Sequence, residues 1–334
     1  MYDVIYFARS DDQYIKTVRE DKSVKNRSLF IGILLVLGAG ILFGNSGIFV
    51  NILGDRGVSE MGISVMRLSF TFLLMFIYLL FFNRSAFRIK KIFLLYFLLT
   101  GSVGMVGSSL FYFYSIRLTS MSVAAVLMYT SPTIVVILSL FILRERLTWR
   151  KFICCLMSFI GTALVSGLFS GEIKSSLLGV IFGLMAGTSY ALYSIFSGAA
   201  IVSGAKPLTV SLYSFAFAGT TMSIVMLVTG GFPELVSTVK GDPYIILIAV
   251  GQSLVTCLLP YVLYTIGIRY AGASNASIMS TVEVVVASIM GLIVYQQYIP
   301  LPGVIGIILV VGSVVVLNIP FSEKHLKRLH RKHN

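Results

Sequence analysis

The stretch GAGILFGNSG, residues 38–47, has a counterpart 143 residues later in IFGLMAGTSY, residues 181–190. A GxxxG pattern therefore recurs near the start of each half of the chain; the glycines that superpose are Gly40 with Gly183 and Gly44 with Gly187. GxxxG is typical of closely packed membrane helices, and by itself it indicates no more than close packing.

A second match follows in the same order along the chain. SIRLTSMSVA, residues 115–124, aligns with GIRYAGASNA, residues 267–276, at a shift of 152 that places Arg117 on Arg269. The change from 143 to 152 corresponds to a difference in loop length. Two matches in the same order predict that the chain consists of two copies of one folding unit.

Composition places both copies in a membrane. Of the 334 residues, 57% are hydrophobic and 12% charged, with a mean hydropathy of +0.93, whereas soluble domains are about 45–50% apolar and about 25% charged. A helix that crosses the hydrocarbon core needs about 20 mostly apolar residues. Ten such runs are present: 29–50, 61–82, 92–114, 120–142, 150–169, 177–198, 208–229, 244–266, 273–295 and 302–319.

Five spans in each copy determine how the copies are related. Because five is odd, the second copy enters the membrane from the opposite side, which is the inverted-topology arrangement of many secondary transporters. We therefore predict an all-α membrane protein with ten transmembrane helices in two inverted-topology five-helix repeats, 29–169 and 177–319. Tails at 1–28 and 320–334 flank the repeats.

Lysine and arginine predict the orientation. With a cytoplasmic N-terminus, 21 of the 26 Lys and Arg residues lie in the tails or in cytoplasmic loops, and four lie outside. This asymmetry follows the positive-inside rule and predicts a multi-pass protein of the cell membrane with both termini cytoplasmic. The net charge of +13 is thereby explained by topology and anionic lipid, without a nucleic-acid partner.

Several classes of site are not expected. Cys154, Cys155 and Cys257 lie in apolar runs, and the three histidines lie in the C-terminal tail. No metal site or histidine-based triad is therefore expected in the membrane. No cofactor is indicated, and the absence of a GxxxxGK[ST] motif argues against ATP as the energy source.

Glu283, in TVEVVVAS at 281–288, is the only Asp or Glu in the ten predicted spans. A charge at a helix centre costs about 2.5–3.5 kcal/mol on insertion scales, so the side chain is expected to face the bundle interior or an aqueous cavity. As a carboxylate it would receive an ammonium group of the substrate, and as a partly protonated group it would exchange a proton during transport. The alternative is a structural role, as a protonated side chain that closes a helix contact.

Other residues extend the candidate site. Ser131 is the counterpart of Glu283 at the shift of 152, and Met279 shares its helix face. Arg67 is the second intramembrane charge; a structural or topological role is favoured for it, with gating as the alternative. The remaining candidates for substrate contact are polar or aromatic side chains in central spans: Asn45, Tyr112, Tyr129, Tyr190, Tyr261 and Tyr264. Pro132 and Pro260 are expected to interrupt the fourth and eighth spans, as kinks or hinges.

The motifs also follow a recognisable order. They are Phe43-Gly44-Asn45 in the first span, Arg67 in the second, Ser131-Pro132 in the fourth, Arg144-Glu145-Arg146-Leu147-Thr148 in the loop that follows, and Glu283 in the ninth. This set, over about residues 30–320, resembles the ten-helix EamA-type branch of the drug/metabolite transporter superfamily. The chain departs from the family pattern at Phe43, where Trp is usual, at Val284, where Pro is expected after the Glu, and in the loop 296–299, which lacks its Glu.

The resemblance implies a transporter of small metabolites such as amino acids, more often an exporter than an importer. We expect alternating access around a midplane pocket that contains Glu283, driven by ion or substrate gradients, with protons as the candidate coupling ion. An importer or passive facilitator is the first alternative, and a non-transporting structural or regulatory membrane protein is another. An enzyme is not expected, because Glu283 has no His, Asp or Lys partner in the spans to form a catalytic pair.

Overall fold

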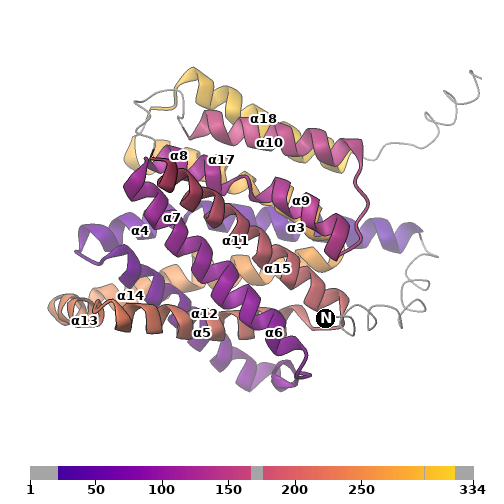
Figure 1. Cartoon of the computed structure of the whole chain (residues 1–334). Coiled ribbons are helices and arrows are strands. Elements are labelled where there is room, and N and C mark those ends of the chain that lie inside the picture. The colour runs from indigo at the N-terminus through magenta and orange to yellow at the C-terminus, as the bar shows by residue number, and fades with distance from the viewer. Residues whose placement is uncertain (1–21, 167–175, 297, 320–334) are drawn as a thin grey trace, which may run out of the picture.

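The computed structural model describes residues 22–166, 176–296 and 298–319, and this part of the chain is helical, without strands. Figure 1 shows one bundle of helices that run roughly across the view. The first repeat contains α3 (Lys22–Gly44), α4 (Ser46–Asp55), α5 (Glu60–Phe82), α6 (Phe93–Leu98), η3 (Leu99–Val106), α7 (Gly107–Leu118), α8 (Met121–Met128), α9 (Ser131–Ile142) and α10 (Trp149–Val165). The second contains α11 (Leu177–Val202), α12 (Pro207–Val228), α14 (Tyr244–Gln252), η4 (Ser253–Leu258), α15 (Leu259–Ala271), α16 (Ala273–Ser280), α17 (Val282–Tyr295) and α18 (Leu301–Asn318).

Nine helical runs in the described residues are long and apolar enough to cross a membrane, and they coincide with nine of the ten predicted spans. The predicted span 150–169 corresponds to α10, which has 17 residues and a length of about 25 Å. α10 lies beside α18, the last span of the second repeat. The count of ten spans remains a prediction, and the tails predicted at 1–28 and 320–334 lie, apart from the start of α3, outside the described residues.

Local sequence signals explain where several helices begin. The hydroxyl groups of Ser59, Ser120 and Thr148 accept hydrogen bonds from the first-turn N–H groups of α5, α8 and α10 at 3.2–3.3 Å. Such N-caps satisfy backbone donors that have no partner within the helix. Two short helices lie outside the spans: η2 (Arg84–Phe87) and α13 (Phe232–Gly241).

The two repeats have equivalent irregularities. The fourth span breaks between α8 and α9, and the ninth breaks 152 residues later between α16 and α17. The third and eighth spans each contain a π-helical segment, η3 and η4. Among the described residues, the two non-glycine residues with positive φ are Arg144 and Gln296, which are also 152 apart. The duplication seen in the sequence therefore extends to the backbone.

The helix pairings are exchanged between the repeats. α3 of the first repeat packs against α15 of the second, and α11 of the second packs against α7 of the first. The equivalent helices α5 and α12 pack against each other, as do α10 and α18. This reciprocity is the arrangement expected of two repeats related by a two-fold axis.

Each GxxxG pattern packs against the broken helix of the other repeat. A Cβ atom at Gly44 would lie 2.8 Å from the carbonyl oxygen of Glu283, and one at Gly187 would lie 2.8 Å from that of Leu127. Glycine is required because any side chain would separate α3 from α17 and α11 from α8. The glycines thus hold both helix breaks at the interface between the repeats.

Pro132 and Pro260 affect the helices of their spans differently. The break in the fourth span falls at Tyr129 and Thr130, and Pro132 lies in the first turn of α9, where its missing N–H group is tolerated. Pro260 lies in the first turn of α15, directly after η4, and the eighth span remains helical throughout. The expected interruption at Pro260 is therefore a π-helical segment, whereas the ninth span breaks at Thr281 without a proline.

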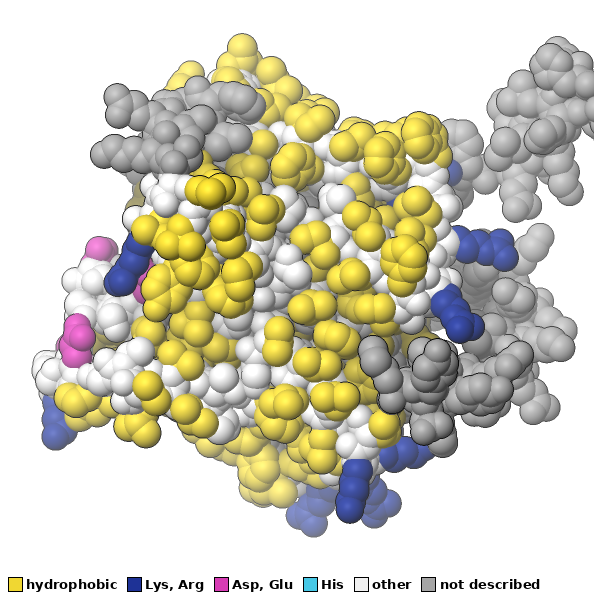
Figure 2. All heavy atoms as spheres, in the orientation of Figure 1, with side chains coloured by type: hydrophobic (Ala, Val, Ile, Leu, Met, Phe, Trp, Pro, Cys, Tyr) yellow, Lys and Arg dark blue, Asp and Glu magenta, His cyan; other side chains and the backbone are white. Residues whose placement is uncertain are grey.

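The surface agrees with a membrane location. In Figure 2 hydrophobic side chains cover the middle of the visible face, Lys and Arg gather mainly at the right and lower edges, and Asp and Glu lie at the left edge. Large exposed hydrophobic residues such as Phe81, Phe141 and Ile293 are 65–76% accessible. An apolar surface of this kind suits acyl chains and would be unfavourable in water.

Candidate functional site

Glu283 lies at the centre of the bundle, in the first turn of α17 directly after the break at Thr281. The broken helix presents its N-terminal end in mid-span, where the helix dipole favours a negative charge. The Glu283 side chain is half-buried. The fold therefore gives this acid a polar environment away from lipid.

Tyrosines from both repeats surround this acid. The Tyr129 side chain, at the break of the fourth span, is a hydrogen-bonding neighbour of the Glu283 carboxyl group. The other tyrosines predicted for the site also lie within electrostatic range of Glu283: Tyr112 on α7, Tyr190 on α11, and Tyr261 and Tyr264 on α15. Of these, Tyr264 is fully buried and the others are half-buried. The structure thus brings together six side chains from five helical segments or breaks of both repeats.

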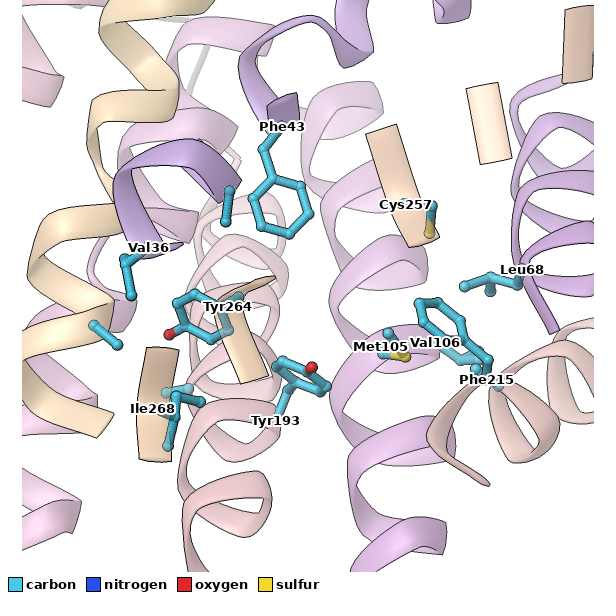
Figure 3. Packing of buried hydrophobic residues seen from close by; sticks show 14 of the residues in the cluster. Val36, Phe43, Leu68, Met105, Val106, Tyr193, Phe215, Cys257, Tyr264 and Ile268 are labelled. Atoms are coloured by element: carbon cyan, nitrogen blue, oxygen red, sulfur yellow. The ribbon is translucent and has the colours of Figure 1, made fainter. Parts of the chain in front are cut away.

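An aromatic cluster, Phe43, Tyr193, Phe215 and Tyr261, adjoins these tyrosines. The ring of Tyr261 meets the other three nearly edge-on, at centroid distances of 4.9, 5.1 and 5.3 Å. Figure 3 shows Phe43, Tyr193 and Phe215 converging from three different helices. Tyr193 and Phe215 are absent from the sequence prediction; Tyr193 could have been found from its position one helical turn after Tyr190.

Buried hydroxyl groups hold these rings in place. The Tyr193 hydroxyl lies 3.1 Å from Thr265 Oγ1, which also receives a hydrogen bond from Ser211 at 3.2 Å. The Tyr264 hydroxyl lies 2.9 Å from Ser194 Oγ. Because these groups have little or no exposure, their hydrogen bonds fix the ring orientations.

For three other residues predicted to contact the substrate, the contacts in the structure do not indicate a binding role. Asn45 joins α3 to α4, and its side-chain amide donates to the carbonyl oxygen of Ile41 at 2.7 Å, so it supports the helix junction. Ser131 is buried in the first turn of α9. Met279 is also fully buried, and its sulfur accepts a hydrogen bond from Asn318 on α18 at 3.3 Å, so it packs against α18.

Arg67 lies on α5 and faces the same interior as Glu283. It is within electrostatic range of both Glu283 and Tyr261, yet the two charged groups form no ion pair within 4.0 Å. The ion pairs within residues 22–166, 176–296 and 298–319 are Arg56–Asp242 and Lys151–Glu145. The Arg67 Nε atom is buried and has no hydrogen-bond partner in the structure.

The repeats pack unequally on the two sides of the site. We call the side with loops 83–91 and 144–151 the basic side. There α9 packs against α16, and Ser139 Oγ lies 2.6 Å from Ser274 Oγ. On the opposite side the equivalent helices α8 and α17 have at most a marginal contact. Likewise α15 packs against α11 and α12, whereas α7 has no comparable contact with α3 or α5. The bundle is therefore closed on the basic side and looser on the opposite side.

Glu145 strengthens the closed side. Its carboxylate accepts a hydrogen bond from the N–H group of Ala273, at the start of α16, and another from Lys151 Nζ, both at 2.9 Å. Gly272, with φ of +81°, brings the backbone close to this carboxylate. Glu145 thus links the first repeat to the second beside a surface hollow of about 440 Å³. In the sequence, its counterpart 152 residues later is Gln297.

No group of three potential metal ligands occurs within the described parts of the chain. The cysteines Cys154, Cys155 and Cys257 are buried and unpaired. A second surface hollow, of about 480 Å³, lies between α5 and α12 and has a mostly apolar lining, which suits lipid better than a polar solute. The polar interior around Glu283 is accordingly the best candidate site.

Comparison with known proteins agrees with this architecture. The family model of the EamA-like transporter family matches residues 30–167 and again residues 177–319. The chain belongs to the EamA-like transporter family. The two matches correspond to the two halves described above, and the protein is a multi-pass membrane transporter.

Relatives of this EamA-like transporter carry the same general description. It is 25% identical over 292 residues to the "Uncharacterized inner membrane transporter YicL" of Salmonella typhimurium, and the aligned region covers 86% of this chain and 95% of that protein. It is 24% identical over 205 residues to an "Uncharacterized transporter" of Archaeoglobus fulgidus, covering 61% of this chain and 70% of that protein. A solved crystal structure with 17% sequence identity has a TM-score of 0.70 and covers 90% of this chain and 98% of that one, so the fold is shared.

Proposed function

We propose that this EamA-like transporter is a secondary exporter of amino acids or similar small metabolites across the cell membrane, by alternating access around Glu283. The protein would cross the membrane with both termini in the cytoplasm, as its Lys and Arg distribution predicts. Import or passive facilitation of the same metabolites is the alternative direction, since a binding site serves transport both ways.

The observation that carries the proposal is the environment of Glu283. Its carboxyl group is half-buried in the middle of a span, at the N-terminal end of a half-helix, and near tyrosines from both repeats. Broken helices at the repeat interface form the midplane substrate sites of many secondary transporters. A carboxylate there would bind an ammonium group, and tyrosines would supply apolar faces and hydroxyl donors.

The unequal packing of the repeats supports alternating access. A pair of related repeats can exchange the closed and open sides by rocking about the site. The present arrangement, closed on the basic side, would be the state that faces the exterior. Opening would separate α9 from α16 and bring α8 toward α17.

Gradients of protons or of the substrate itself would drive the cycle. Glu283 is the candidate group for proton exchange, because both proton and substrate would compete for one carboxylate. A catalytic role is not proposed, because the described groups that act on the Glu283 carboxyl are Tyr129 and Arg67, with no histidine, aspartate or lysine among them.

The test is uptake and counterflow of a metabolite panel in proteoliposomes, with and without a proton gradient, for wild type and Glu283→Gln. A matched control is Glu234→Gln on α13, which lies outside the spans. We expect Glu283→Gln to lose proton-coupled transport and Glu234→Gln to retain it. Normal transport by Glu283→Gln across a range of pH would show that this acid is structural and that the proposal is wrong.

A further inference from the structure

A second set of polar side chains, Arg67 on α5 and Gln252 on α14, lies inside the bundle, and Arg67 is within electrostatic range of Glu283. Thr71 Oγ1 donates to the carbonyl oxygen of Arg67 at 2.6 Å and lies 3.3 Å from that of Ser253. This bridge joins α5 to the start of η4, and α5 also packs against α14, whose last residue is Gln252. One cationic and one amide side chain therefore lie on adjoining helical segments, and no hydrogen bond joins Arg67 Nε to the Gln252 amide.

Both side chains contain buried polar atoms that lack partners. Gln252 is fully buried, and neither its Oε1 nor its Nε2 atom has a hydrogen bond; the same holds for Arg67 Nε. In the part of the chain that the structure describes, these are three of six buried side-chain polar atoms without a partner. Buried polar groups are normally hydrogen-bonded, and groups that are not require an explanation such as a water molecule or a ligand.

The surroundings of Arg67 indicate which other groups a ligand bound to Arg67 would contact. Arg67 lies within electrostatic range of Cys257, Tyr261 and Glu283. In Figure 3, Cys257 and Leu68, the neighbour of Arg67, lie on one side of Phe43, and Tyr264 lies on the other. With Glu283 ionised, Arg67 and Glu283 carry opposite charges in one interior and form no ion pair within 4.0 Å. An interior charge is costly when it is unpaired, so a bound group that neutralises both would be strongly favoured.

We propose that Arg67 and Gln252 form a subsite for the carboxylate of a zwitterionic substrate whose ammonium group binds to Glu283. This inference rests on the proposed function and assigns the substrate a positive and a negative end. The guanidinium group presents two parallel N–H donors that match a carboxylate. The Gln252 amide adds a third donor, and its oxygen accepts from the ammonium group or a bridging water. The aromatic cluster contacts the apolar part of the substrate.

Specificity follows from the two charges. A ligand without its carboxylate leaves Arg67 and Gln252 unpaired, and one without its ammonium group leaves Glu283 unpaired. Sites that hydrogen-bond a buried group discriminate strongly against analogues that lack it. Arg67 would therefore be a specificity-determining residue, in place of the structural or gating role that its sequence position favoured.

The probes are three equimolar mixtures of the apolar amino acids, as free amino acids, as primary amides and as N-acetyl derivatives. Counterflow into proteoliposomes is quantified by mass spectrometry. Wild type should transport the free amino acids at least tenfold faster than either derivative. Arg67→Gln should reduce the preference over the amides to less than threefold and keep the preference over the N-acetyl derivatives. Glu283→Gln should reduce the preference over the N-acetyl derivatives to less than threefold and keep the preference over the amides.

Controls separate this inference from the proposed function. Arg56→Gln removes an arginine paired with Asp242 outside the site and should leave both preferences unchanged. Gln252→Leu provides a second test if Arg67→Gln does not fold, because it should weaken the preference over the amides by at least threefold. If both Arg67→Gln and Gln252→Leu keep the wild-type preference for free amino acids over their amides, the proposed carboxylate subsite is wrong, although the proposed transport function still holds. If wild type transports only ligands that carry a single charge, the inference of a zwitterionic substrate is wrong. If wild type transports no metabolite, the proposed function is wrong.

Discussion

Removal of the charge on Glu145 should open the basic side of the bundle. The carboxylate accepts hydrogen bonds from Ala273 N–H and Lys151 Nζ, both at 2.9 Å, and the side chains of Lys151 and Glu145 are 13% and 19% exposed. Hydrogen bonds to charged groups contribute about 1.5–3 kcal/mol, and neutral ones about half as much. Only the bond to Ala273 crosses between the repeats, since Lys151 belongs to the same repeat as Glu145. Because a glutamine retains a weaker bond there, Glu145→Gln should cost the closed state about 1 kcal/mol, a shift of roughly fivefold in the gate equilibrium.

The assay measures access to Ser274, whose hydroxyl meets Ser139 within the closed interface. A cysteine replaces Ser274 in a chain without the native cysteines, and a membrane-impermeant maleimide is applied from the basic side. Addition of Glu145→Gln should accelerate labelling about fivefold, and Glu145→Ala should accelerate it further. The control is Glu60→Gln, at the start of α5 on the opposite side, which should have no effect. An unchanged labelling rate in a Glu145→Gln protein that still transports would refute the role of Glu145.

Three further predictions concern packing and polarity. Gly44→Ala should destabilise the protein by about 1–3 kcal/mol, because the added Cβ would lie 2.6 Å from the Cβ of Val286. The control is Gly47→Ala, whose Cβ would meet nothing within 4 Å and should not destabilise the protein. Thermal unfolding in detergent compares the two variants. Gln252→Leu should leave the unfolding temperature equal or higher while transport falls, since it removes two buried unsatisfied atoms; a clear fall in stability would contradict this reasoning. Tyr264→Phe should lose about 1 kcal/mol of stability with its hydrogen bond to Ser194, and unchanged stability would show that this bond contributes little.

Hydropathy was sufficient to predict nine of the ten expected spans, because length and apolarity are direct consequences of the bilayer. The second span, predicted at 61–82, is Glu60–Phe82 in the structure. The GxxxG repeat also identified the close contacts of Gly44 and Gly187, although not their partners. Those partners are the helix breaks of the opposite repeat, and contacts between distant segments have no local sequence signature.

The breaks themselves were only partly predictable. Pro132 marks the break of the fourth span, but Thr281 marks that of the ninth without a proline, so the repeat architecture and not the local residue type imposes it. Of the candidate site residues, the tyrosines do converge on Glu283, whereas Met279 packs toward α18. Helix periodicity placed Met279 on the face of Glu283, but that periodicity assumes a continuous helix, and the ninth span breaks between the two residues at Thr281.

The reactivity of a cysteine at position 283 tests the central claim most directly, namely that this position faces a water-accessible interior between the repeats. In Glu283→Cys, a membrane-impermeant thiosulfonate added from the side opposite the basic side should modify the cysteine. The matched control is Ile293→Cys, on the same helix and 65% exposed on the apolar surface, which should react only with a lipid-soluble reagent. Modification of position 283 by the lipid-soluble reagent alone would contradict the account.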